Sequence, residues 1–587
     1  MAITLVSLIA VLLGNVKAGA APPVRDAAAD PEKARAMSPR GEATGGMVAT
    51  VHPLATQAGV AALEAGGNAV DAAVAAAVTL GVVDGHNSGV GGGCLILIRR
   101  ANGEILAIDG REMAPGKAHR DLYIRDGELD IEASQTGPLA AAVPGALAAY
   151  DQALAKAGKL NLAAALLPAA KIADDGFAID RIYASKIAST AEPIKKFPET
   201  RRILMKPDGS PLREGGLLKQ PDLAKTYRGV AEHGVAWFYR GPIAKLVAEW
   251  MADHGGIMTE QDFANYEVRF REPLRTTYRG HEVIGFPPPS SGGVHVAQML
   301  NILEGFDLRG LAQRNRADFV HVVAESMKLA FADRAFWLGD PDYAPVPRGL
   351  ADPAYAKSLR EKIDMTKTTK VAGHGTPPLA NDDLFADGGK RKVTLEKHTT
   401  HIAAADSAGN WVAITATVNT TFGSKVIVPG TGVILNNQMD DFTVQPGVAN
   451  SFGLQGAEAN VVMARKRPLS SMSPTVVLKD GRPVLTVGAA GGPTIISQVL
   501  LAIINHVDFG LPVDQSLAGH RFHHQWSPDV LRVEENLPTA VQDELKRRGH
   551  DVRTTRGIGV SQGIQWDGVK FIGSHDPRVP GKAAGPK

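Results

Sequence analysis

One hairpin decides the fold of this chain: residues 398–417 read HTTHIAAADSAGNWVAITAT. The pattern predicts two strands, Thr399 to Ala405 and Trp411 to Val418, joined by a short turn that contains Gly409. A three-residue hairpin loop holds its glycine in the left-handed conformation, and this fixes how the two strands pair. The first residue of one strand then lies opposite the end of the other.

In this register Thr399 faces Thr417. A threonine hydroxyl is a weak nucleophile unless a base accepts its proton. Cleavage before Thr399 would give this residue a free α-amino group, whose pKa of about 8 suits a base near neutral pH. Thr417 would then hydrogen-bond the Thr399 hydroxyl and fix its orientation. Two threonines at the start of a strand also follow from β-propensity alone, so the hairpin by itself leaves both interpretations open.

The segment before the hairpin, from about residue 365 to 398, is rich in Lys, Thr, Gly and Asp and has no sustained apolar period. It predicts an exposed loop, in which a cut in the chain is tolerated. The Thr399 hydroxyl could itself attack the preceding carbonyl, which would make the cut intramolecular.

Residues 1–20 predict a signal peptide. An apolar run from Ile3 to Leu13 precedes Ala18-Gly19-Ala20, and this run is shorter than the ~20 apolar residues that a membrane-spanning helix needs. We expect cleavage near Ala20 or Ala21 and export of a periplasmic or secreted protein without stable membrane insertion. No Lys or Arg precedes the apolar run, so an uncleaved anchor is the alternative.

Composition limits the remaining possibilities. The chain of 587 residues is long enough to bury a large core without disulfides or metals. Its 63 basic and 61 acidic residues leave a formal charge of +2, so no clustered basic face for nucleic acid is expected. The single cysteine, Cys94, cannot form an internal disulfide and is interpreted as a small buried hydrophobic residue.

Helices and strands are expected in blocks. Residues 53–82 predict two Ala-rich helices, and residues 145–260 are mainly helical. Further helices are expected at 295–303, 317–338, 494–505 and 538–548. Further strands are expected at 95–98, 105–108, 475–478, 484–487, 563–566 and 570–572. This order predicts an α+β fold in which helices cover sheets.

Other segments carry polar groups that suit a substrate site. Arg111 follows a strand and could hold a carboxylate in a bidentate pair, or form a surface salt bridge. The loop from Gly488 to Thr494 joins a strand to a helix, where backbone N–H groups can stabilise an oxyanion, although a plain turn is the alternative. Residues 465–473 offer hydroxyls and positive charge, and residues 436–441 offer amides and carboxylates that suit an ammonium group. No metal site is expected, because the adjacent histidines at 523 and 524 would point to opposite faces of a strand.

In this order the segments resemble the γ-glutamyltranspeptidase family of N-terminal-nucleophile hydrolases, over residues 45–578. The matching stretches are Asp109 to Pro115, Pro287 to Gly293, Ala324 to Tyr343, Thr399 to His401, Thr417 to Gly423, Leu435 to Phe442, Arg467 to Thr475, Gly491-Gly492, Arg521 to Trp526 and Asp576 to Arg578. The resemblance implies a four-layer αββα sandwich made of two subunits, residues 21–398 and 399–587, which self-cleavage produces from one precursor. It also implies γ-glutamyl transfer from glutathione and related compounds, through a γ-glutamyl-Thr399 intermediate, to water or to an acceptor amino acid or dipeptide, without a cofactor.

The resemblance implies a role for each matching residue. Thr399 would be the nucleophile and the new N-terminus, and Thr417 would support it. Gly491 and Gly492 would form the oxyanion hole. The α-carboxylate of the substrate would be held by Arg111, Ser470 and Ser471, and its α-amino group by Asn419, Gln438 and Asp441. Such a site suits a zwitterion and would reject plain acyl groups by leaving buried polar groups unpaired.

Two departures from the family pattern bear on substrate range. Phe452 stands in the lid loop, residues 440–456, where tyrosine is common, and Ala489 and Thr494 stand where serine and arginine are commoner. A related amidohydrolase, such as a glutaryl-cephalosporin acylase-like enzyme, is the main alternative, but it would not need Asp441 as an ammonium partner. A second alternative is an uncleaved binding protein with a decayed site, which would run as one full-length band on a denaturing gel.

Overall fold

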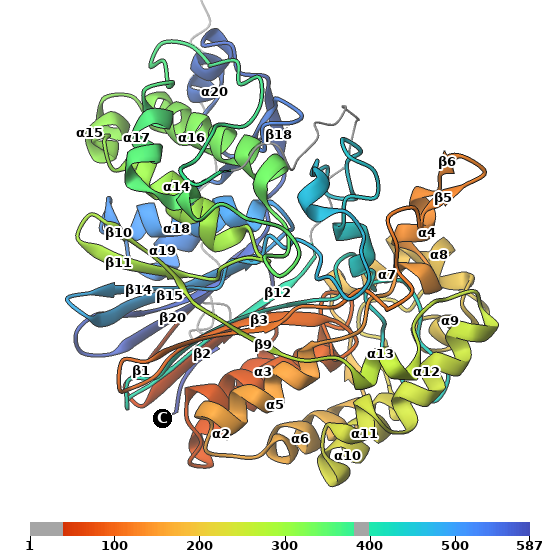
Figure 1. Ribbon diagram of the computed structural model, residues 1–587. Coiled ribbons are helices and arrows are strands. Elements are labelled where there is room, and N and C mark those ends of the chain that lie inside the picture. The colour runs from red at the N-terminus through yellow and green to blue at the C-terminus, as the bar shows by residue number, and fades with distance from the viewer. Residues whose placement is uncertain (1–38, 381–397, 587) are drawn as a thin grey trace, which may run out of the picture. The chain divides into compact units, whose positions relative to one another are not determined.

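The computed structural model describes residues 39–380 and 398–586. The expected signal peptide and residues 381–397 of the expected polar loop lie outside these ranges. Within them, two stacked β-sheets lie between two layers of helices (Figure 1). This is the α+β class that the order of elements predicts, in the four-layer αββα arrangement that the family resemblance implies.

Each of the two main sheets has seven strands. Sheet I contains, in spatial order, β1 (Arg40–Ala43), β20 (Phe571–His575), β19 (Val560–Trp566), β15 (Arg482–Ala490), β14 (Thr475–Lys479), β11 (His281–Gly285) and β10 (Leu274–Tyr278). Sheet II contains β21 (Lys582–Ala584), β2 (Gly46–Thr50), β12 (Thr400–Asp406), β13 (Trp411–Thr417), β3 (Gly93–Arg99), β4 (Ile105–Gly110) and β9 (Arg269–Arg271). Neighbouring strands in both sheets are antiparallel.

Helices cover the outer face of each sheet (Figure 1). Those on the side of sheet II are α2 (Pro53–Glu64), α3 (Ala69–Val83), α5 (Ala146–Ala157), α6 (Leu162–Asp175) and α10 (Pro221–His233). Those on the side of sheet I are α14 (Gly292–Leu303), α15 (Leu308–Arg314), α16 (Arg316–Trp337), α17 (Pro353–Arg360), α18 (Thr494–Val507), α19 (Val513–Ala518) and α20 (Thr539–Arg547).

Shorter elements join these layers. The remaining α-helices are α4 (Ile131–Gln135), α7 (Arg181–Ser189), α8 (Ala191–Lys195), α9 (Pro198–Leu204), α11 (Ala236–Tyr239), α12 (Pro242–Asp253) and α13 (Glu260–Ala264). The small sheets comprise β5 (Ile124–Arg125) with β6 (Glu128–Leu129), β7 (Phe177–Ala178) with β8 (Leu217–Leu218), and β16 (Phe522–His523), β17 (Leu531–Glu534) and β18 (Val552–Thr555). The 3₁₀ turns found in the described residues are η1 (Pro138–Ala140), η2 (Arg348–Ala351), η4 (Gln438–Asp441) and η5 (Glu458–Asn460).

The β12–β13 hairpin lies in the interior of sheet II, between β2 and β3, and has the expected register. Thr400 pairs with Ala416, and Gly409 in the turn has a φ of +98°. Successive residues of β12 face opposite sides of the sheet, as a pleated strand requires. Ile402 packs into the core beneath sheet II, whereas Ala403 packs into the layer between the two sheets. The strand is therefore buried on both faces, which explains why apolar and small residues occupy both of them.

One helix begins earlier than the sequence predicts. Helix α14 starts at Gly292, not at His295. A Cβ added at Gly292 would lie 2.1 Å from Ser473 Oγ, and one at Gly293 would lie 2.3 Å from the Phe286 carbonyl oxygen. The two glycines therefore serve close packing inside the first turn of the helix, and they do not mark a loop.

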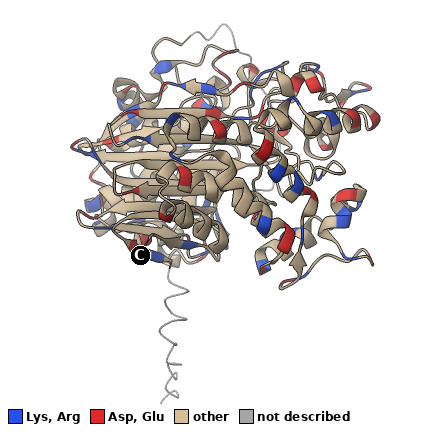
Figure 2. Ribbon diagram, turned by 90° about the horizontal axis from the view of Figure 1, so that it is seen from below, with Lys and Arg blue, Asp and Glu red and all other residues tan. Residues whose placement is uncertain are grey.

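Charged side chains are concentrated on the outer helices and turns. Figure 2 shows Lys, Arg, Asp and Glu interspersed on these elements, with fewer of them on the stacked strands. Within residues 39–380 and 398–586, no helix is both long enough and apolar enough to cross a membrane.

Candidate active site

Thr399 lies at the end of the hairpin, immediately before β12. Its φ of +100° is one that L-residues rarely adopt, and it is the only β-branched residue with a positive φ in the described part of the chain. Backbone held in such a conformation is strained by about 1–3 kcal/mol. The His398–Thr399 peptide bond is therefore adjacent to a strained residue whose own hydroxyl lies beside it.

Thr417 holds the Thr399 hydroxyl. Thr399 Oγ1 donates to Thr417 Oγ1 at 3.1 Å, and the backbone N–H of Asn419 donates to the same Thr417 oxygen at 2.8 Å. Both threonines are buried. Because both acceptor positions of Thr417 Oγ1 are in use, the orientation of the Thr399 hydroxyl is defined from the neighbouring strand, as the register predicts.

The Gly491-Gly492 loop lies against the peptide bond before Thr399. The backbone N–H of Gly491 donates to the His398 carbonyl oxygen at 3.0 Å. The φ angles of Gly491 and Gly492 are +131° and +57°, so the loop needs residues without a Cβ here. The predicted oxyanion donor is thus already bonded to the carbonyl that precedes the nucleophile.

The acidic side of the site is built on the turn η4. Asp441 accepts a hydrogen bond from Gln438 Nε2 at 2.8 Å. Asn419, which has a φ of +82°, donates from its side chain to the Asn437 carbonyl at 2.9 Å. The amides of Asn419 and Gln438 and the carboxylate of Asp441 thus line the same cavity as Thr399.

Arg111, the residue predicted to bind a carboxylate, pairs directly with Asp441. Its Nη2 donates to Asp441 Oδ2 at 2.5 Å, and its Nη1 lies 3.4 Å from Glu112 Oε2. Burial raises the pKa of Glu112 to about 7, although Arg111 opposes this shift. The surface salt bridge considered for Arg111 is wrong, because the side chain is almost fully buried. The two groups expected to hold opposite ends of a zwitterion hold each other in the structure.

Ser470 and Ser471 complete the basic side of the site. Both are buried and line the cavity. Arg334, from the last turn of α16, also lines it and donates to Ser471 Oγ at 3.1 Å. Sequence reasoning did not select Arg334, although it lies within the stretch Ala324 to Tyr343 that carries the family resemblance.

The structure therefore brings all ten predicted site residues together. Nine of them line one cavity: Arg111, Thr399, Thr417, Asn419, Gln438, Asp441, Ser470, Ser471 and Gly492. The tenth, Gly491, contacts the carbonyl of His398. The free space in the cavity, about 20 Å³, accommodates about one water molecule. A larger group can enter only if the Arg111–Asp441 pair or the lid gives way.

Phe452 forms the lid of this cavity. Its side chain is buried, and a Cβ added at Gly492 would lie 2.6 Å from the Phe452 ring. Gln525 Nε2 donates to the Gly453 carbonyl at 3.0 Å and anchors the loop. The phenyl ring therefore covers the site by packing on Gly492, as expected for the position where tyrosine is common.

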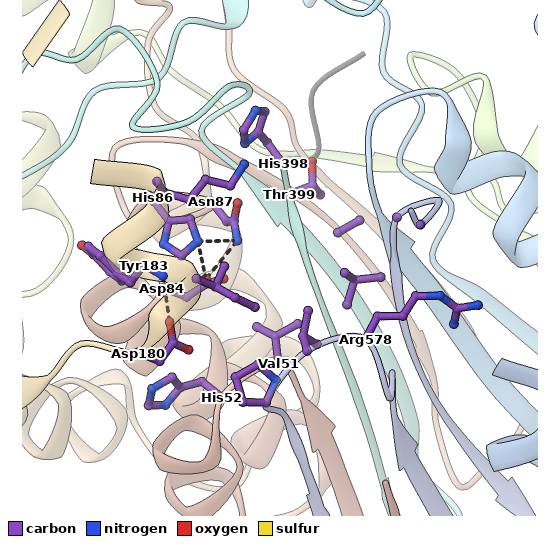
Figure 3. Close-up of a pocket in the computed structure, with 18 of the residues that line it drawn as sticks. Val51, His52, Asp84, His86, Asn87, Asp180, Tyr183, His398, Thr399 and Arg578 are labelled. Atoms are coloured by element: carbon purple, nitrogen blue, oxygen red, sulfur yellow. Dashed lines mark hydrogen bonds and ion pairs between the residues drawn. The ribbon is translucent and has the colours of Figure 1, made fainter. Parts of the chain in front are cut away.

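A second cavity, of about 300 Å³, also reaches His398 and Thr399 (Figure 3). One wall carries Asp84, His86 and Asn87, with Asn87 Nδ2 donating to Asp84 Oδ1 at 2.9 Å. Each of these three side chains has a buried polar atom without a hydrogen-bond partner among the described residues. A cavity of this size with such polar atoms in its wall accommodates several water molecules. Because His398 and Thr399 line the cavity, water there can lie next to these two residues.

One cluster in the described part of the chain has the composition of a metal site: His321, Glu325 and His550. Its ligand atoms already bind one another and a neighbouring cation. His321 Nδ1 lies 2.8 Å from His550 Nε2, and Lys328 Nζ lies 2.9 Å from Glu325 Oε1. The buried ammonium takes the place of a metal ion as the counter-charge of Glu325.

Two stacked sheets between helical layers, with a threonine at the start of an interior strand, define the class of N-terminal-nucleophile hydrolases. The chain belongs to the γ-glutamyltranspeptidase family, because the family model described as Gamma-glutamyltranspeptidase matches residues 55–586. The family expected from the sequence is thereby confirmed, and with it the classification of the chain as an enzyme.

The chain is similar over most of its length to a glutathione hydrolase and to acylases. The chain is 42% identical to the glutathione hydrolase proenzyme of Escherichia coli (strain K12) over 537 residues, which cover 91% of this chain and 90% of that protein. It is 38% identical to the acylase ACY 1 proenzyme of Pseudomonas sp. (strain SE83) over 532 residues, covering 89% and 90%. The crystal structure of cephalosporin acylase from Bacillus halodurans matches with a TM-score of 0.80 and 28% identity, covering 93% of this chain and 97% of that chain. Taken with the family model, the similarity to the glutathione hydrolase supports the main interpretation over the acylase alternative.

Proposed function

We propose that this protein is a γ-glutamyltransferase and glutathione hydrolase that is made as a self-cleaving precursor. The observation that carries the proposal is the arrangement around Thr399. The Thr399 hydroxyl is bonded to Thr417, and the carbonyl before it is bonded to the Gly491 N–H. Nucleophile, scissile carbonyl and oxyanion donor lie together in the uncut chain.

Self-cleavage would proceed through an ester. Thr399 Oγ1 attacks the His398 carbonyl carbon and loses its proton, while the Gly491 N–H stabilises the oxyanion. The C–N bond then breaks, and the Thr399 nitrogen takes a proton and becomes a free amine. Water from the second cavity hydrolyses the ester, leaving a carboxylate on His398 and restoring the Thr399 hydroxyl. Release of the strained φ at Thr399 favours the cut.

The mature site would use the same atoms in each turnover. The free α-amine of Thr399 accepts the hydroxyl proton as Oγ1 attacks the γ-glutamyl carbonyl. Gly491 and Gly492 stabilise the oxyanion, and the leaving amine takes the proton. Water or an acceptor amine then removes the γ-glutamyl group from Thr399. For glutathione the leaving group is Cys-Gly, and no cofactor is needed.

Substrate recognition would exchange one ion pair for two. Arg111 and Asp441 pair with each other in the structure. The α-carboxylate of a γ-glutamyl group would take Arg111 with Ser470 and Ser471, and its α-ammonium would take Asp441 with Gln438 and Asn419. A glutaryl acyl group has no ammonium and would leave the half-buried Asp441 carboxylate without a cationic partner, which disfavours it.

The subunit and location assignments belong to the same proposal. The large subunit would comprise residues 21–398 and the small subunit residues 399–587, both derived from one precursor. Removal of residues 1–20 would deliver the protein to the periplasm or the medium. The sequence of the N-terminal segment supports this, and N-terminal sequencing of both purified chains tests it.

The central experiment is a denaturing gel combined with an activity assay. The purified protein is expected to give two chains, with the smaller one beginning at Thr399, and to release the anilide from a γ-glutamyl anilide. Thr399→Ala is expected to remain one chain and to be inactive. A single full-length wild-type band without γ-glutamyl turnover would rule out the proposed function. Rates with and without glycylglycine then separate hydrolysis from transfer.

A further inference from the structure

Arg334 carries a buried charge that the described protein does not neutralise. Its side chain comes from the end of α16, is 4% exposed, and lines the cavity that contains Thr399. Within residues 39–380 and 398–586, no carboxylate oxygen lies within 4.0 Å of its guanidinium nitrogens. The side-chain hydrogen bonds of the guanidinium go to two serine hydroxyls. Its Nε donates to Ser291 Oγ at 2.9 Å and its Nη2 donates to Ser471 Oγ at 3.1 Å.

Arg111, which directly follows β4, differs from Arg334 because its charge has partners. Its guanidinium lies within hydrogen-bond or ion-pair distance of Asp441, Glu112 and the carbonyls of Pro468 and Leu469. Its charge is therefore largely compensated before any substrate binds. A buried ion without a partner is costly, so the uncompensated guanidinium is the one with most to gain from an incoming anion.

The charges nearest to Arg334 belong to the same site. Burial lowers the pKa of Arg334 to about 10, Asp441 opposes this shift and Arg111 adds to it. Arg334 therefore remains cationic at neutral pH. The cavity holds two guanidinium groups and one carboxylate that pairs with the first of them. Its net positive charge predicts an anionic ligand group on the side of Arg334.

The hydrogen-bond directions show how this charge reaches the ligand. Because the guanidinium can only donate, it occupies an acceptor position of Ser471 Oγ. The Ser471 hydroxyl is then left to donate its own proton, and it lines the cavity. Ser291 makes the equivalent use of its proton by donating to the Ser470 carbonyl at 2.7 Å. Arg334 thus sets Ser471 as a donor and fixes the backbone of the neighbouring serine.

We propose that Arg334 is the residue that makes the site select an α-carboxylate, acting through the Ser471 hydroxyl as a positioning residue and as the counter-charge of the carboxylate. The inference rests on the proposed function, because it concerns the γ-glutamyl group. It assigns to Arg334 the electrostatic part of recognition, while Arg111 exchanges Asp441 for the substrate.

The test compares two anilide substrates on the two-chain enzyme. One is γ-glutamyl-p-nitroanilide, and the other is 4-aminobutanoyl-p-nitroanilide, which keeps the ammonium and the scissile amide but lacks the α-carboxylate. Arg334→Gln is expected to lower kcat/KM for the γ-glutamyl substrate about 10- to 100-fold, mainly through KM, as loss of a charge-assisted contact predicts. It is expected to change kcat/KM for the 4-aminobutanoyl substrate less than about 3-fold.

A further variant separates recognition from structure. Arg334→Lys keeps the charge without the planar fork, so it is expected to restore part of the ratio and serves where Arg334→Gln fails to fold. An equal fall with both substrates in Arg334→Gln, or in Arg334→Lys where it replaces that variant, would overturn the inference. If the wild type fails to turn over the γ-glutamyl substrate, the proposed function fails first.

Discussion

Replacing Thr417 by valine tests whether the neighbouring strand activates Thr399. The substitution keeps the shape of the side chain and removes only the oxygen that accepts from Thr399 Oγ1 and from the Asn419 N–H. A buried donor left without a partner costs about 1–3 kcal/mol, so Thr417→Val is expected to lower the free energy of unfolding by about 2 kcal/mol. The Thr399 hydroxyl also loses its defined orientation.

The effect on rate follows from the same bond. A net hydrogen bond contributes about 0.5–1.5 kcal/mol, and about 1.4 kcal/mol corresponds to a factor of ten in rate. Self-cleavage and γ-glutamyl turnover in Thr417→Val are therefore expected to slow about 10-fold. Self-cleavage is followed as the loss of the full-length band in freshly made precursor, and turnover by anilide release from the two-chain enzyme.

Thr415 provides the matched control. It lies two residues earlier on β13, is equally buried, and its hydroxyl bonds His401 Nδ1 at 2.9 Å. Thr415→Val is expected to destabilise the protein by a similar amount, because it also leaves a buried partner unpaired, but to change both rates less than about 2-fold. If the two variants slow both reactions equally, the loss is one of general stability, and the role assigned to Thr417 is wrong.

The remaining predictions concern the carboxyl beside Arg111, the lid and the ester. Folding raises the pKa of Glu112 from 4.5 to about 7, so between these pH values the folded state keeps a proton that the unfolded state loses. The contribution of Glu112 to the free energy of unfolding therefore falls as the pH rises from 4.5 to 7, by up to about 3 kcal/mol. Glu112→Gln is expected to remove this fall, measured as the difference in Tm from wild type between pH 4.5 and 8; an unchanged difference contradicts it. Gly492→Ala is expected to displace Phe452 and lower kcat/KM at least about 10-fold, because a Cβ there meets the ring at 2.6 Å. Gly481→Ala, at a similar φ of +73° but with no atom within 4 Å of the added Cβ, is expected to lose stability only, and equal losses of activity would refute the packing argument. Neutral hydroxylamine is expected to accelerate separation of the chains by attacking the ester on Thr399; no acceleration would argue against an ester intermediate that accumulates.

The hairpin and the fold class could be predicted because their causes are local. The loop containing Gly409 sets the register, and alternation along the strands sets which faces are buried. The start of α14 could not be predicted in the same way. Gly292 and Gly293 are usual in loops, and only the approach of Ser473 and Phe286, distant in the chain, shows that they serve packing within a helix.

The composition of the site could be predicted, but its pairing could not. The order of motifs along the chain carried the family resemblance, and all ten residues lie together. The ion pair between Arg111 and Asp441 joins residues 330 positions apart, and no spacing rule predicts such a contact. The burial of Arg334 could not be predicted for a related reason, because one arginine among several charged residues on a long helix gives no local signal of burial.

The geometry divides the site residues into two groups by the reaction that uses them. The Gly491 N–H binds the His398 carbonyl in the uncut chain, and after the cut the same donor is free for the carbonyl of a substrate. On the proposed mechanism Thr399, Thr417 and Gly491 serve both reactions, and changes to them should slow both in proportion. The contacts of Arg111, Asp441 and Arg334 include the Arg111–Asp441 ion pair and two serine hydroxyls, and none found for these three residues in the described part of the chain involves the His398–Thr399 peptide. Changes to these three should leave self-cleavage intact and affect only turnover, so the ratio of the two rates assigns each residue to its group without reference to any relative.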